Sequence, residues 1–195
     1  MVSYSEALDN IDQGLEEEAI KELEEISESN PGFLFAQDKL QQVRDNIKVL
    51  EQERERLIKE YVDNILLNID FSTEGWGMAI NNAWSSLMSS FRYQAMLNFN
   101  EELIKKGVDL NANMFGDAYP IKAGEMLSYY NIMAHHQLKH HEEVINLGQV
   151  FMQAYPVSNY FIAIKAYVDQ SLTELEARRE GAKRNELQTS IETFL

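Results

Sequence analysis

The four histidines of this chain all lie within one short segment, His135–His141. In a continuous helix His136 and His140 would be one turn apart, so both imidazoles could reach one metal ion, with Glu142 or Glu143 as a third ligand. The last four residues of the segment, however, fall where a turn between paired helices is expected. We therefore interpret the segment as a polar turn and predict no bound metal, with the pair His136 and His140 kept as the alternative.

The same segment could respond to pH, because a free imidazole titrates near pH 6.5 and neighbouring glutamates favour its charged form. A metal- or pH-responsive module built on His135–His141 is therefore one alternative function. It requires the thermal midpoint or the affinity for a partner to differ between about pH 5.5 and about pH 7.5.

No other group of residues indicates catalysis. Gly75-Trp76-Gly77 lacks the preceding strand and the helix-start spacing of a phosphate-binding loop. The chain contains no cysteine and no nucleophile elbow. Carboxylate runs such as Glu16–Glu18, on an acidic amphipathic helix, are typical of a solvated face. The sequence therefore predicts a protein that is not an enzyme and that binds no cofactor.

The elements that carry these residues follow a repeating pattern. The heptapeptide Glu17–Leu23 returns with changes as Glu55–Tyr61 and as Tyr93–Phe99, and its third residue recurs every 38 positions (19, 57 and 95). A shorter copy, Glu142–Ile145, follows after an insertion over residues 107–122 that is rich in loop-forming residues. Similarity at a fixed period of this size is typical of stacked-repeat proteins.

Helical spacing of apolar residues and the composition predict an all-α fold, because only three prolines and nine glycines interrupt 195 residues rich in helix formers. We expect one domain, residues 1–195. It would consist of helix pairs over about 3–31, 33–69, 73–107 and 122–156, and a last helix over about 158–187. The turn of the second pair cannot be placed within residues 40–69, although Arg54 on the apolar stripe is the favoured break.

The pairs resemble tetratricopeptide repeats, in which a small residue on the second helix is followed by apolar residues and then by a proline that ends the helix. The matching residues are Ala19, Leu23, Ile26 and Pro31 in the first unit and Val144, Phe151 and Pro156 in the last. The resemblance implies a short right-handed solenoid of antiparallel helix hairpins with a C-terminal capping helix. Another helical-hairpin solenoid and a compact helical bundle are the alternatives.

The resemblance also implies a function and a site. Tetratricopeptide arrays bind peptides on the concave face formed by the first helix of each pair, so we expect a non-catalytic adaptor or scaffold that binds a protein or peptide there. The residues implied are Ile80, Trp84, Leu87, Tyr129, Met133 and His136. The competing interpretation is that these residues form the core.

Charge narrows the choice of partner. The formal net charge is −15, and residues 1–30 contain ten acidic side chains against Lys21 alone, which gives −9. Nucleic acid and anionic membranes are therefore poor partners, whereas a basic segment would be attracted. No apolar run suits a membrane helix and no signal peptide is evident, so the cytoplasm is the default location unless an export signal has been removed.

A further alternative is self-assembly into a homo-oligomer. The chain ends in the apolar residues Ile191, Phe194 and Leu195, which could dock on a neighbouring molecule.

Overall fold

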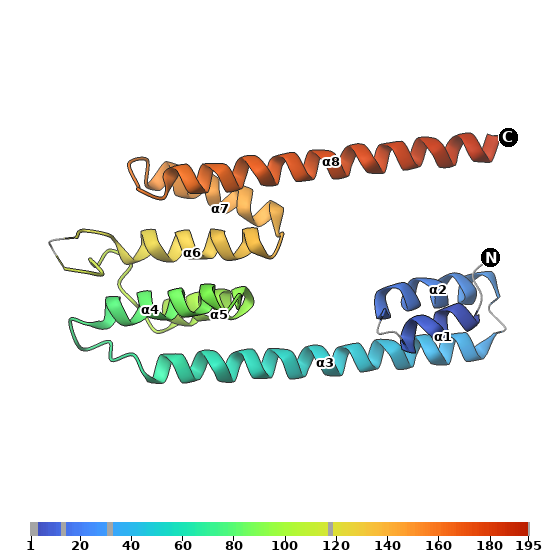
Figure 1. The fold of residues 1–195 in the computed structure, drawn as a ribbon, viewed down its shortest axis with the longest axis horizontal. Coiled ribbons are helices and arrows are strands. Elements are labelled where there is room, and N and C mark those ends of the chain that lie inside the picture. Colours follow the sequence, from blue (N-terminus) through green and yellow to red (C-terminus); the bar gives the residue numbers. More distant parts are fainter. Residues whose placement is uncertain (1–3, 13–14, 31–32, 117–118, 195) are drawn as a thin grey trace. The chain divides into compact units, whose positions relative to one another are not determined.

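The computed structural model describes residues 4–12, 15–30, 33–116 and 119–194, with side chains for all of these except 12, 16 and 186–194. The described residues form eight helices and no strand, which confirms the all-α prediction (Figure 1). They divide into two compact units, residues 1–57 and 58–195, where the sequence predicts one domain. Among the described residues no helix is long and apolar enough to cross a membrane.

The unit 1–57 contains α1 (Tyr4–Asp12), α2 (Glu16–Ser29) and the first part of α3 (Leu34–Leu67). Helices α1 and α2 pack together as the sequence predicts for the first pair. Small and aliphatic side chains at helical spacing bury one face of each helix, which forms a separate core of Ala7, Leu23, Ala36, Leu40 and Val43.

Helix α3 is one continuous element, where the sequence predicts a pair with a turn near Arg54. No glycine or proline interrupts it, and ion pairs within the helix join Arg56 to Glu53 at 2.6 Å and Lys59 to Asp63 at 2.9 Å. Arg54 lies on the exposed surface, where an arginine fits a helix well. The second helix pair of the predicted repeat is therefore absent from the described chain.

The unit 58–195 contains the end of α3 and five further helices. These are α4 (Trp76–Ser89), α5 (Tyr93–Lys105), α6 (Ala123–Gln137), α7 (His141–Ala154) and α8 (Phe161–Phe194). Consecutive helices pack on one another from α4 to α8, and α6 also packs on α8. Helix α6 is consequently surrounded, and Gln137 alone among its side chains is fully exposed.

Two short turns in this unit have the same backbone conformation. Phe91, two residues after α4, has a φ of 57°, and Lys139, two residues after α6, has a φ of 60°. In both turns the next N–H reaches back to close the helix: Arg92 donates to the Leu87 carbonyl at 2.9 Å and His140 donates to the His135 carbonyl at 3.0 Å. The left-handed residue reverses the chain, so that the following helix begins at once.

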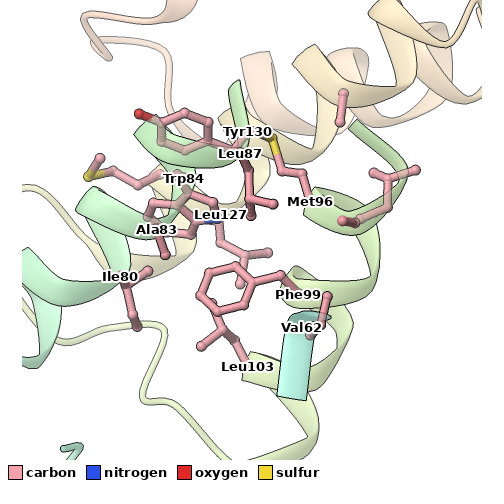
Figure 2. Close-up of a cluster of buried hydrophobic side chains, with 14 of the residues drawn as sticks. Val62, Ile80, Ala83, Trp84, Leu87, Met96, Phe99, Leu103, Leu127 and Tyr130 are labelled. Carbon is pink, nitrogen blue, oxygen red and sulfur yellow. The ribbon is translucent and has the colours of Figure 1, made fainter. Parts of the chain in front are cut away.

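The core between α4, α5 and α6 is built around Trp84 (Figure 2). Its ring stacks on Tyr130 of α6, with centroids 4.7 Å apart, and meets Phe99 of α5 edge-on at 6.4 Å. Its Nε1–H donates a hydrogen bond of 2.7 Å to Asn100 Oδ1. One side chain therefore ties three helices together through packing and through a satisfied buried polar group.

The segment after α5 folds back over α4. The Met114 side chain is buried, and its backbone N–H donates to the Ile121 carbonyl at 3.0 Å. The backbone passes so close to α4 that a Cβ built on Gly77 would lie 2.0 Å from the Met114 carbonyl oxygen. Only glycine fits at this position of α4.

Candidate functional site: a polar pocket between α5 and α6

Four of the six residues predicted to contact a partner lie in the core. Ile80, Trp84 and Leu87 on α4 are at most 1% exposed, and Met133 on α6 is 4% exposed. They hold the helices together, and this structure offers none of them at a surface. A partner-binding role for these four side chains has no structural support here and stays a prediction.

The other two predicted residues are half-buried and already have aromatic neighbours, Tyr160 directly before α8 and Tyr167 on α8. Tyr129 stacks on Tyr160 with ring centroids 4.2 Å apart, and His136 stacks on Tyr167 at 4.3 Å. Burial raises the pKa of Tyr129 and of Tyr167, so both phenols stay neutral at physiological pH. On this side of α6 the chain's own rings cover the helix.

The histidine segment is divided between two helices and the turn joining them. Helix α6 ends at Gln137 and α7 begins at His141, so the continuous helix that would bring His136 and His140 together is not formed. The structure instead brings together His135 and His140, whose Nδ1 atoms are 3.0 Å apart. His141 is buried, and its Nδ1 lies 3.3 Å from Ser171 Oγ on α8.

A pocket of about 370 Å³ opens on the other side of α6, facing α5 and the start of α7. We call it the α5–α6 pocket. The helical positions 127, 131 and 135 of α6 share one face, as do 94, 97, 101 and 104 of α5. Its lining residues are Gln94, Leu97, Asn100, Glu101, Ile104, Leu127, Asn131, His135, His140 and Glu143.

The pocket is lined by amide, carboxylate and imidazole groups together with aliphatic side chains. Asn100 is 2% exposed, and the hydrogen bond from Trp84 fixes the orientation of its amide. Asn100 Nδ2 lies 3.5 Å from Asn131 Oδ1, the long limit of a hydrogen bond, so this donor retains capacity. Glu101 and Glu143 are exposed at the rim and give it negative charge.

Burial is the main influence on the pKa of His135 and of His136. The sequence predicted instead that neighbouring glutamates would favour the charged form of these imidazoles. Burial lowers the pKa of His135, the electrostatic interaction with His140 lowers it further, and Glu143 opposes this. Burial and then His141 lower the pKa of His136. Both imidazoles are therefore held in the neutral form at pH 7.

Acidification from about pH 7.5 to about pH 5.5 should lower the thermal midpoint of the unit 58–195. For His135 and His136 the unfolded chain binds protons more readily than the folded chain. Their contribution to stability is complete above the unfolded pKa of about 6.5 and is lost as pH falls from there through the lowered folded-state pKa. Circular dichroism melts at the two pH values measure the shift.

The matched variant for this measurement is His135→Asn with His136→Gln. We expect it to melt at temperatures that differ less between the two pH values. An equal difference in both proteins would show that other groups cause it.

Helical periodicity contained a signal for this pocket that the sequence analysis did not use. Asn131 and His135 are polar residues one turn apart on α6, and Gln94 and Glu101 share a face of α5. Polar residues on the same side of neighbouring helices can indicate a polar site between them.

A larger pocket, of about 930 Å³, lies between the start of α4 and the segment before α6. Trp76, Met78, Phe115 and Tyr119 contribute most of its rings and apolar side chains, and Glu74 is its one ionisable carboxylate. Its wall adjoins residues 117–118, which the structure does not describe. We therefore base no function on it.

The apolar residues proposed for self-assembly, Ile191, Phe194 and Leu195, lie outside the described side chains. Within the described part of the chain, no group of three or more His, Asp and Glu side chains is arranged to hold a metal ion. No protein-family model, no curated protein and no solved structure matches this chain.

Proposed function

We propose that this protein is a non-catalytic adaptor that holds an extended peptide segment of a partner protein in the α5–α6 pocket. The helices α4 to α7 would form two stacked, tetratricopeptide-like hairpins in a short right-handed array, and α8 would be the capping helix. The packing of each helix on the next, together with the contact between α6 and α8, supports this arrangement. The proposal moves the contact site away from the face implied by the sequence resemblance.

The amide groups of the pocket carry the proposal. An extended peptide presents N–H and C=O groups that need partners, and each side-chain amide offers both a donor and an acceptor. Gln94, Asn100 and Asn131 line one pocket, and the Asn100 amide is held in place from behind by Trp84. Because the Asn100 amide is held in place before binding, less conformational entropy is lost when the peptide docks.

The charge of the pocket specifies the peptide further. Glu101 and Glu143 lie at its rim, and the whole chain carries a net charge of −15. A peptide with a lysine or arginine would be steered toward the pocket and would pair with these carboxylates. The partner segment is therefore expected to be basic.

Selection from a randomised peptide library against the intact chain, in buffer with a chelator, should enrich peptides that contain Lys or Arg. Fluorescence anisotropy should then show about tenfold weaker binding for Asn131→Leu, since one buried hydrogen-bonding partner is lost. Added salt should weaken binding mainly through slower association.

The double variant Glu101→Gln with Glu143→Gln should also weaken binding. Its matched control, Glu174→Gln with Glu176→Gln, makes the same change of charge on exposed positions of α8 and should have little effect. Equal affinities for the two double variants, or a library without enriched peptides, would contradict the proposed function.

A further inference from the structure

The pair His135 and His140 forms a second feature at the edge of the α5–α6 pocket. Their Nδ1 atoms are 3.0 Å apart although they belong to different elements. The backbone brings the two residues close together, because the His140 N–H donates to the His135 carbonyl at 3.0 Å and Lys139 between them has a left-handed φ of 60°. A non-glycine residue in this conformation is uncommon, and here it brings two imidazoles together.

The distance between the two nitrogens is what a metal ion requires. Zn²⁺, Ni²⁺ and Cu²⁺ bind imidazole nitrogen at about 2.0–2.1 Å, so two nitrogens lie about 3 Å apart in the tetragonal geometry of Cu²⁺ or Ni²⁺ and about 3.3 Å apart in the tetrahedral geometry of Zn²⁺. We propose that His135 and His140 together bind a late first-row divalent metal ion, Zn²⁺, Ni²⁺ or Cu²⁺, through their Nδ1 atoms. Water would complete the coordination, and Glu143, which lines the same pocket, would balance part of the charge.

Proton transfer within one ring allows this. At 3.0 Å one ring can donate an Nδ1–H hydrogen bond to the other Nδ1, in which case the donor ring carries its proton at Nδ1. Metal binding needs a lone pair at both Nδ1 atoms, which the donor ring supplies by moving its proton to Nε2.

The other two histidines have structural partners within the chain. His136 stacks on Tyr167, and His141 lies against Ser171. The site is thus distinct from the pair His136 and His140 that helical spacing suggests. It also does not depend on the proposed peptide binding, which is measured with a chelator present.

Isothermal titration of ZnCl₂ into the intact chain at about pH 7.5 tests the proposal. We expect one site per chain that is lost, or weakened at least tenfold, in the variant His135→Asn with His140→Asn. The control His136→Gln should keep the site. Mg²⁺ should give no matching heat, since it prefers oxygen ligands.

Nitrogen-15 spectra of the imidazoles in the wild-type protein give a second measurement that needs no variant. Zn²⁺ should shift Nδ1 of His135 and of His140 and leave the ring nitrogens of His136 unchanged. Equal heats in wild type and double variant, or an unshifted Nδ1 in either ring at saturating Zn²⁺, would overturn the proposal.

Discussion

Replacing Gly77 with alanine should destabilise the unit 58–195 by about 3 kcal/mol, at the upper end of what overpacking costs. The new Cβ would lie 2.0 Å from the Met114 carbonyl oxygen and 2.8 Å from Met114 Cα. These are backbone atoms, so no rotamer change relieves the clash. The segment carrying Met114, whose side chain is 2% exposed, would have to move away from α4. Urea unfolding followed by tryptophan fluorescence measures the loss, since both tryptophans lie in α4.

Gly75 provides the matched control two residues earlier. Its φ is −80°, which alanine also adopts, and a Cβ there would meet nothing closer than Thr73 Oγ1 at 3.9 Å. Gly75→Ala should change the free energy of unfolding by less than about 1 kcal/mol. Similar losses in the two variants would show that the close approach of the Met114 backbone does not determine the stability of this unit.

The sequence predicted the helices well where a glycine, a proline or a small residue determines the local structure. Gly107, with φ of 74°, follows α5, and Pro156 follows α7 at the predicted places. The repeat anchors Ala19 and Ala95 are buried at 0% and 3% exposure. Small residues and helix stoppers act through their own backbone and immediate neighbours, so a sequence reveals them directly.

The repeat spacing did not predict the structure of its second copy correctly. Leu57 occupies the anchor position but is 52% exposed in the middle of α3. Periodicity identifies the residues that share a face of a helix, and it does not reveal whether another helix covers that face. No glycine or proline occurs at the turn expected near Arg54, so the helix continues through it.

The candidate site shows the same limitation on α6. Tyr129 and His136 share one face of this helix, and Asn131 and His135 share another. The first face was predicted to contact a partner, but Tyr160, directly before α8, and Tyr167 on α8 cover it. Which face stays open depends on where α5, α7 and α8 pack, and that is decided by contacts distant in sequence.

Replacing Trp84 with alanine should destabilise the unit 58–195 by about 4 kcal/mol, because a large, fully buried side chain is removed. The change would leave a cavity between Tyr130 and Phe99 and would deprive Asn100 Oδ1 of its donor. Circular dichroism during urea unfolding measures it without relying on the lost fluorophore. A loss this large identifies Trp84 as a core residue, whereas a side chain held ready for a partner would cost little.

The variant Trp84→Phe separates packing from hydrogen bonding. It keeps much of the ring contact but leaves the buried Asn100 amide without its donor, so we expect a smaller loss, of about 2 kcal/mol. Adding Asn100→Leu to this variant removes the unsatisfied acceptor and should restore part of that loss, because neither partner of the hydrogen bond then remains. Strictly additive losses in the double variant would mean that the bond between Trp84 and Asn100 does not couple α4 to α5. The α5–α6 pocket would then lack the support that fixes its central amide.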